Sequence, residues 1–206
     1  MPPDILKILR PSIDVLMPYA VAAAADEIVA GTRLWLERAV IGLNLCPFAK
    51  AVYNKEQIRY AITAARSADE LLAELAHEME ILKQTDPSEL DTTLLIHPLA
   101  MTNFMDYHFF LGEALATVKN LGLEGVIQIA SLHPDYEFSG TATDDIDNYT
   151  NRSPYPTLHL LREASVDRAV AAYPDAAEIF ARNIKTLHRL GHQGWQQLWL
   201  AGEKKK

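Results

Sequence analysis

Hydrophobic residues recur at three- and four-residue intervals in several stretches of the chain, which is the spacing of one buried helix face. The first stretch begins at Asp26 and ends near Gly42, with Pro47 shortly afterwards. A second begins after Ser67, whose hydroxyl can cap a helix, and ends at Asp86. The same spacing predicts further helices over residues 103–119, 166–173, 176–190 and 193–200.

Short β-rich runs separate these helices. Residues 57–63 place Ile58, Tyr60 and Ile62 on one face, the alternation of a half-buried strand. Three further strands are predicted over residues 92–96, 126–130 and 157–162. The order strand, helix, strand, helix, strand predicts parallel pairing with right-handed connections. We therefore expect an α/β fold with a small mixed, mostly parallel sheet of four strands, flanked by helices.

The longest stretch without periodicity runs from Asp135 to Pro156. It is rich in Asp, Asn, Thr, Ser, Gly and Pro and contains four aromatic residues. A loop of this length is uncommon inside a compact domain and is usually functional when it occurs. We expect it to form one wall of a binding pocket.

The domain organisation follows from these patterns. Residues 26–200 are expected to form a single α/β domain, preceded by a flexible alanine-rich extension over residues 1–25 and followed by a basic tail over residues 201–206. The apolar run within the first 25 residues is interrupted by Pro18, and it is too short for a membrane span. No membrane association is expected.

Composition narrows the function classes. The 206 residues include 27 acidic and 19 basic side chains, giving a formal net charge of −8. This balance disfavours a general nucleic-acid binder, which needs clustered Lys and Arg. Cys46 is the single cysteine, so that no intramolecular disulfide can form and a reducing compartment, the cytoplasm, is expected.

Two segments match a known family. They are residues 42–50, GLNLCPFAK, and residues 128–163, which contain HPDY and NYTNRSPYPTLHLLRE. On these motifs the chain resembles the bacterial domain-of-unknown-function family numbered 1415, over roughly residues 24 to 195. The resemblance implies a bacterial, cytoplasmic protein. It brings no activity, substrate or cofactor, so any chemistry must be inferred from the side chains.

Histidines mark the ends of two predicted strands. His97 and His133 each precede a proline, and in parallel neighbouring strands they would meet at the carboxyl edge, where open α/β sheets bind ligands. His159 would return to this edge if the fourth strand runs antiparallel. The period of two places Glu163 on the same face as His159. With Asp135, these residues are the candidate catalytic groups; each histidine could instead serve only as a structural hydrogen-bonding residue.

Several chemistries remain open for this edge. His97, His133 and His159 could bind a divalent metal such as zinc, with a nearby carboxylate as ligand or general base, although the usual compact zinc motifs are absent from the sequence. The acidic loop could hold a hard cation or be a solvated surface. Cys46 could act as a nucleophile or as a small buried hydrophobe. No nucleotide cofactor is expected, because the sequence has no glycine-rich phosphate loop and no dinucleotide-binding motif.

The loop also supplies candidate substrate-binding residues. Arg152 could clamp a carboxylate or phosphate of a small ligand, or pair with the loop's own aspartates. Asn148, Asn151 and Tyr155 could contact the same ligand, although asparagines also order turns through their own backbone.

Two function classes follow. The favoured one is a small-molecule enzyme with a histidine-lined polar site at the carboxyl edge, walled by residues 135–156. The alternative is an acidic protein-interaction or regulatory module without catalysis, in which Tyr136, Phe138, Tyr149 and Tyr155 are exposed anchors. Burial of these rings around a pocket would favour the enzyme. The substrate and the oligomeric state are left open by the sequence.

Overall fold

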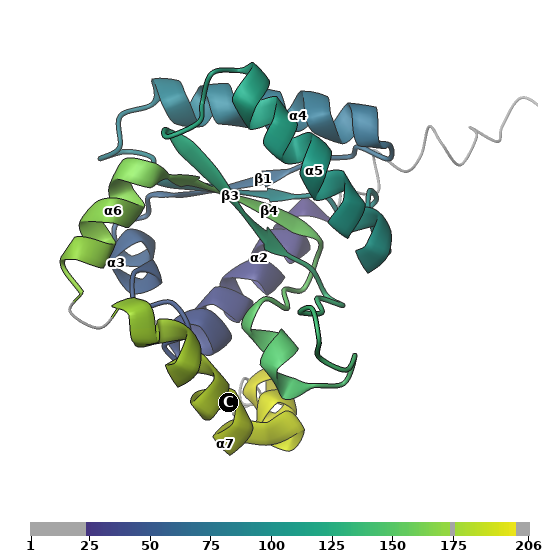
Figure 1. Cartoon of the computed structure of the whole chain (residues 1–206), viewed down its shortest axis with the longest axis vertical. Helices are drawn as coiled ribbons and strands as arrows, with labels where there is room; N and C mark the ends of the chain where they lie inside the picture. The colour runs from purple at the N-terminus through teal and green to yellow at the C-terminus, as the bar shows by residue number, and fades with distance from the viewer. Residues whose placement is uncertain (1–23, 174–175, 201–206) are drawn as a thin grey trace, which may run out of the picture.

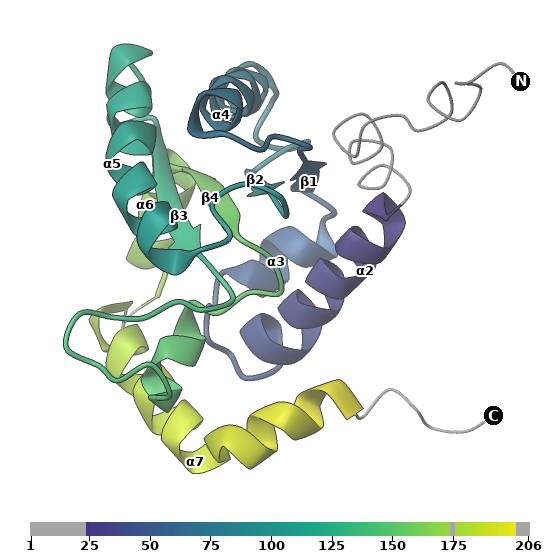
Figure 2. The same ribbon diagram turned by 90° about the vertical axis from the view of Figure 1, so that its right-hand side faces the viewer.

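The computed structural model describes residues 24–173 and 176–200. The expected extension, apart from its last two residues, and the expected basic tail lie outside these ranges. An open four-stranded sheet forms the middle of the described chain, with helices packed against both of its faces (Figure 1). Figure 2 shows α4 and α5 on one side of the sheet and α2 and α3 on the other.

The elements have the following bounds. The strands are β1 (Ile58–Ile62), β2 (Thr92–Ile96), β3 (Ile127–Leu132) and β4 (Thr157–Arg162). The α-helices are α2 (Ala25–Trp35), α3 (Ala49–Asn54), α4 (Ala68–Gln84), α5 (Phe104–Asn120), α6 (Glu163–Ala171) and α7 (Ile179–Leu200). The shorter segments are the π-helix η1 (Leu36–Ile41) and the 3₁₀ segments η2 (Ile146–Thr150) and η3 (Ala176–Glu178).

The strand order in the sheet is β1-β2-β4-β3. Only the β1–β2 pair is parallel, while β4 runs antiparallel to both β2 and β3. The expectation of a mostly parallel sheet is therefore wrong, although the mixed α/β class and the four strands are confirmed. The reason is that the long loop lets β4 turn back and insert between β2 and β3, where it satisfies the backbone groups of both.

Two hydrophobic clusters cover the two faces of the sheet. One packs α4 and α5 against the sheet through fully buried side chains such as Leu75, Tyr107 and Leu158. The other packs α2, η1 and α7 against the opposite face through residues including Trp35 and Leu187. Within the described ranges, no helix has both the length and the apolar character needed to cross a bilayer.

The local signals of the sequence explain several helix boundaries. Ser67 caps α4 as predicted, its hydroxyl accepting the Glu70 N–H at 3.2 Å. Asn103 caps α5 in the same way. Gly191, with a left-handed φ of 63°, kinks α7 between the two helices that the sequence predicts there. The helices α3 and η2 were not predicted from the periodicity, because both are only one or two turns long.

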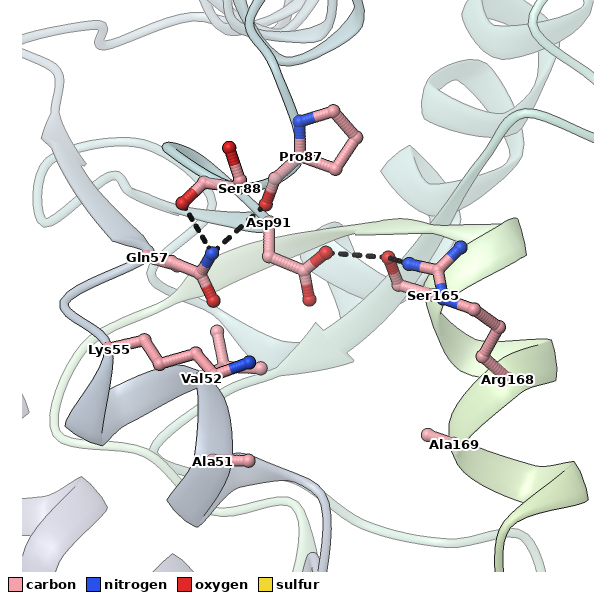
Figure 3. A pocket seen from close by; sticks show the side chains of 10 residues that line it. All are labelled: Ala51, Val52, Lys55, Gln57, Pro87, Ser88, Asp91, Ser165, Arg168 and Ala169. Carbon is pink, nitrogen blue, oxygen red and sulfur yellow. Dashed lines mark hydrogen bonds between the residues drawn. The ribbon is translucent and has the colours of Figure 1, made fainter.

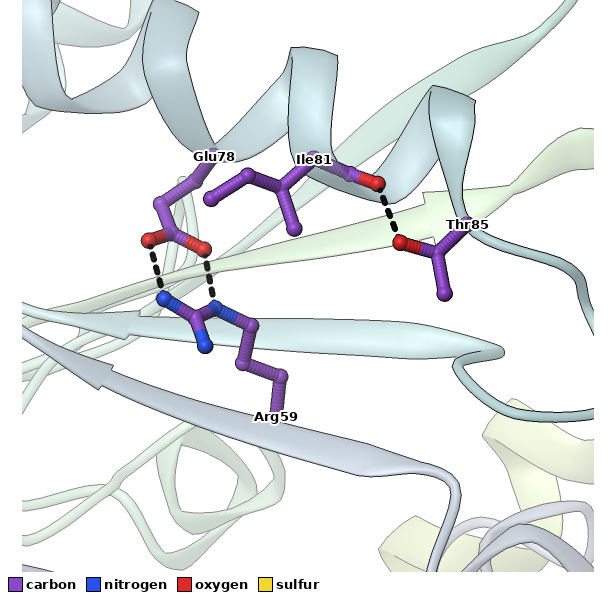
Figure 4. A network of polar contacts seen from close by, with 4 residues as sticks. All are labelled: Arg59, Glu78, Ile81 and Thr85. Atoms are coloured by element: carbon purple, nitrogen blue, oxygen red, sulfur yellow. Dashed lines mark hydrogen bonds and ion pairs between the residues drawn. The ribbon is translucent and has the colours of Figure 1, made fainter.

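An ion pair joins the first strand to α4 (Figure 4). Arg59 of β1 donates two hydrogen bonds to the Glu78 carboxylate, at 2.7 and 3.0 Å. The Glu78 side chain is 5% exposed, whereas that of Arg59 is 43% exposed. The pair holds a nearly buried carboxylate on the sheet-facing side of α4.

Replacing Arg59 with leucine is expected to lower the free energy of unfolding by about 2 kcal/mol, because Glu78 then remains buried without its charged donor. The measurement is urea denaturation at pH 7. The double variant Arg59→Leu/Glu78→Leu is expected to recover most of this loss, since it removes both charges. Lys83→Gln is the control, because it removes only the exposed Lys83–Glu80 contact at 3.7 Å and should cost less than about 0.5 kcal/mol. Equal losses in the single and double variants would contradict this interpretation.

Candidate functional site

The two histidines that follow β2 and β3 lie close together at one edge of the sheet. Because both strands are antiparallel to β4, they point in the same direction and end at the same edge without being neighbours. His97 and His133 both pack against Tyr107 of α5, with ring-centroid distances of 5.7 and 5.2 Å. Both residues are 0% exposed. The structure thus brings these two predicted residues together, in a layer between the sheet edge and α5 that is closed to solvent.

The hydrogen bonds of the two imidazoles indicate opposite neutral tautomers. His97 Nδ1 donates to the Ala100 carbonyl at 2.9 Å, which leaves Nε2 unprotonated. His133 Nδ1 accepts from the Asp135 N–H at 3.0 Å, and Nε2 donates to the Met101 carbonyl at 3.2 Å. Burial lowers the pKa of His97 to about 4 and also lowers the pKa of His133. His97 Nε2 is buried without a hydrogen-bond partner among the described residues.

The third predicted histidine lies on the other face of the sheet. His159 is paired with Leu94, a member of the cluster that faces α2 and η1. Its Nε2 donates to the Thr92 hydroxyl at 2.8 Å, because the proton of that hydroxyl is already donated to a β4 carbonyl at 2.6 Å. Burial lowers the pKa of His159 to about 4. The sheet therefore separates this imidazole from the other two.

The two predicted carboxylates also lie apart. Asp135 is beside His133, which its backbone N–H contacts, but its side chain is exposed. Glu163 begins α6 at the far end of β4, where its backbone N–H donates to the Val126 carbonyl at 3.0 Å. Asp135 therefore adjoins the histidine pair, and Glu163 does not.

The predicted substrate-binding asparagines bond to the protein itself. Asn148 is 0% exposed. Its Oδ1 accepts from the Phe138 N–H at 3.0 Å and from the Thr141 hydroxyl at 2.7 Å, and its Nδ2 donates to the Ala142 carbonyl at 2.8 Å. Asn151 donates to a carbonyl of β3 at 3.2 Å. These contacts give the loop a defined conformation despite its length.

Arg152 has a similar role. It donates to the carbonyls of Tyr136, at 3.2 Å, and Thr143, at 2.5 Å, while its guanidinium carbon lies 4.4 Å from the centroid of the Tyr149 ring. Tyr155 is half-buried against the cluster that includes Trp35. The substrate-binding roles of these residues stay predictions, and the contacts observed for Arg152 are ones that shape the loop.

The aromatic side chains of the loop pack inward. All four are half-buried. The Tyr136 ring centroid is 5.2 Å from that of Phe104, and the Tyr149 centroid is 5.0 Å from that of Trp195. They do not form an exposed patch of the kind expected for partner anchors.

A different set of residues approaches metal-ligand geometry. Asp145, Asp147 and His188 offer ligand atoms that all lie within 4.8 Å of one another, and His188 Nε2 is 2.8 Å from an Asp147 oxygen. These groups are half-buried or exposed. The half-buried Cys46 thiol has a pKa raised by burial, which disfavours the thiolate needed for nucleophilic chemistry.

A cleft of about 420 Å³, with both apolar and polar lining residues, opens at the opposite end of the strands (Figure 3). It lies where β1 and β2 begin and where β4 passes into α6. Its volume is within the range typical of small-molecule sites. The residues lining it are Ala51, Val52, Lys55, Gln57, Pro87, Ser88, Asp91, Ser165, Arg168 and Ala169.

The polar groups of this cleft form a connected arrangement. Gln57 and Asp91 directly precede β1 and β2, and the Gln57 carbonyl accepts the Asp91 N–H at 3.0 Å. Ser165 donates to Asp91 Oδ1 at 2.5 Å, and Arg168 donates to the Ser165 hydroxyl at 2.9 Å. Figure 3 shows Arg168 extending from α6 towards Ser165 and Asp91, while Lys55, which directly follows α3, lines the other side of the cleft.

The cleft therefore offers two cations, one carboxylate and neutral hydrogen-bonding groups. The Lys55 ammonium has no ion pair within the described part of the chain. Sequence reasoning missed these residues because they come from separate segments and form no motif. The only available signal was the position of Gln57 and Asp91 immediately before two strands.

Comparison with known proteins gives one informative result. Residues 27–197 match a family described as a protein of unknown function (DUF1415). No curated protein and no solved structure matches the chain. The match confirms the resemblance inferred from the two sequence motifs, and the family description adds no activity to it.

Proposed function

The chain belongs to the DUF1415 family, and we propose that it is a small-molecule-binding protein whose ligand occupies the cleft between α3, β2 and α6. The observation that supports this proposal is the hydrogen-bonded chain Arg168–Ser165–Asp91 in the wall of a cleft that Lys55 also lines. These groups lie in a concave site of ligand size, where few and well-placed polar groups set specificity.

The charges of the cleft define the ligand class. Lys55 and Arg168 suit a carboxylate, to which an arginine can bond with two parallel N–H groups. Asp91 keeps an oxygen free to accept a hydrogen bond from an amino or hydroxyl group, because only its Oδ1 is bonded to Ser165. The ligand is a small metabolite with a carboxylate near an amino or hydroxyl group.

The test is a thermal-shift screen of α-amino acids and 2-hydroxy acids with the full chain, followed by isothermal titration calorimetry of the compounds that stabilise it. Lys55→Gln and Arg168→Gln are each expected to weaken binding about tenfold, because each removes a charge-assisted hydrogen bond. Asp91→Asn should weaken amino acids more than hydroxy acids, because an ammonium group loses its counter-charge.

The matched control is Lys50→Gln, which makes the same change at an exposed position on α3. It should leave affinity unchanged. Loss of affinity in this control equal to that in Lys55→Gln would show only a general charge effect. Failure of all compounds of both classes to bind would contradict the proposed ligand class.

The enzymatic role predicted for the histidine-lined edge concerns a second candidate site, at the other end of the strands from the cleft. Its support is the unpartnered Nε2 of His97, a neutral imidazole nitrogen that could accept a proton or a hydrogen bond. A substrate could reach it only if α5 or the loop moved. His133→Gln discriminates the two sites in the same titrations. Unchanged affinity supports recognition in the cleft, and loss of affinity in a folded variant supports the histidine edge.

A further inference from the structure

A second pocket, of about 450 Å³, lies between α7 and the turn that follows η1. The turn contributes Leu43 and Asn44, the latter in a left-handed conformation with φ of 56°. The helix contributes the other lining residues, which are Arg182, Lys185, Thr186 and Arg189.

The charge of this pocket has one sign only. Its three charged side chains are cations, spaced three and four residues apart on α7, and no carboxylate is among the lining residues. None of the ion pairs of the described residues involves them. Like charges at this spacing repel each other and destabilise a helix. A bound anion would offset this repulsion. Such a cluster of cations also stands out in a chain whose net charge is −8.

One of the cations is already held in place. Arg182 donates through Nη1 to the Tyr173 hydroxyl, and its guanidinium carbon lies 5.5 Å from the centroid of the Tyr173 ring. The Tyr173 ring in turn packs edge-on against Phe48, with centroids 5.8 Å apart. The other terminal nitrogen of Arg182, Nη2, is buried and has no acceptor within the described ranges. A buried donor without a partner is costly. Because Nη2 is closed to solvent, an anion in the pocket would supply its acceptor after a small turn of the guanidinium.

We propose that this pocket binds the phosphate group of a small phosphomonoester. Arg182, Lys185 and Arg189 neutralise the phosphate, and the Asn44 amide and Thr186 hydroxyl supply neutral hydrogen bonds. A phosphate offers close to two negative charges and three acceptor oxygens, which suits three cations better than a single carboxylate does.

The size of the pocket favours an ester over the free ion. About 450 Å³ is much more than one phosphate fills, and it matches the volume of a small-molecule site. Leu43 supplies an apolar surface for the organic part of the ligand. Three cations are too few for a nucleic-acid surface in a chain that is acidic overall.

The test is titration of the full chain with glycerol 3-phosphate, inorganic phosphate and glycerol, followed by calorimetry and by ³¹P NMR. We expect the ester to bind more tightly than inorganic phosphate, and glycerol not to bind. Lys185→Gln and Arg189→Gln should each weaken ester binding about tenfold, since each removes a charged hydrogen bond. Lys185→Arg should retain most of the affinity.

Two control variants show whether the ester binds in this pocket or at another cationic surface of the protein. Lys119→Gln and Lys83→Gln remove exposed cations of α5 and α4; neither should change ester binding. Equal loss in Lys119→Gln, or no loss in Lys185→Gln, overturns the assignment of the site. Equal affinity for inorganic phosphate and the ester would contradict a phosphomonoester as the ligand and would assign the pocket to free phosphate. Absence of binding by either phosphate compound at 10 mM overturns the proposal, whatever the outcome for the cleft.

Discussion

Lowering the pH from 7 to 5 is expected to reduce the free energy of unfolding by about 2 kcal/mol for each of two histidines, His97 and His159. Burial lowers the pKa of each to about 4 in the folded protein, whereas in the unfolded chain it is about 6.5. Between these values the unfolded chain binds more protons, so that stability is fully present above about pH 6.5 and is lost as the pH falls towards 4. Urea denaturation at pH 7, 6 and 5 measures the loss.

Variants that keep the native hydrogen bonds isolate each contribution. His97→Asn retains a donor for the Ala100 carbonyl, and His159→Gln retains one for the Thr92 hydroxyl. Each should remove about 2 kcal/mol of the pH-dependent loss. His77→Gln, at an exposed position on α4, should leave it unchanged. A free energy of unfolding that is constant between pH 7 and 5 would contradict the expected effect of burial on both pKa values.

Arg162→Met is expected to lower the free energy of unfolding by about 3 kcal/mol, since a charged donor to several carbonyls is lost while they stay partly buried. The Arg162 guanidinium, at the end of β4, donates to the carbonyls of Leu82, Thr85 and Leu90, at the end of α4 and in the segment that follows it. Its positive charge also interacts favourably with the partial negative charge at the C-terminal end of α4. Urea denaturation at pH 7 is the measurement.

The comparison variants test whether the directional hydrogen bonds matter. Arg162→Lys keeps the charge but only part of the planar donor geometry, and it should cost about half as much. Arg189→Met makes the same chemical change at an exposed position and should stay within about 0.5 kcal/mol of the unaltered protein. Similar losses at the two arginines would show that carbonyl capping by Arg162 contributes little.

The sequence predicted the number and place of the strands better than their order. Each strand appears as a local pattern, whereas order depends on where a long loop returns. A signal was nevertheless present in the strands themselves. Gln128 in β3 and Arg59 in β1 are exposed polar residues within their strands, as befits edge positions, whereas β2 is buried along its whole length. Treating these polar positions as edge markers would have placed β1 and β3 at the edges, and therefore β4 in the centre.

The candidate site was harder to predict, for a physical reason. The side chains of His133, Asn148 and Arg152 are of the types that bind ligands, but in this fold they bond to carbonyl, N–H or hydroxyl groups of the protein. A sequence does not show whether such a group meets a ligand or a nearby peptide bond. Lys55 and Arg168 are ordinary surface residues by pattern, and only the fold brings them to one cleft.

The central place of β4 has a consequence for biosynthesis. Residues 92 and 161 are paired in the sheet, so that nearly 70 further residues must be synthesised before β2 can pair with β4, its second neighbour. On the ribosome, β3 has no partner at all until β4 emerges. Until that moment β2 and β3 both present open edges to other nascent chains. Early termination or proteolytic cleavage before residue 157 leaves a fragment whose unpaired edges can template aggregation. The last strand therefore completes the fold and also covers the facing sides of β2 and β3, which would otherwise be open to intermolecular pairing.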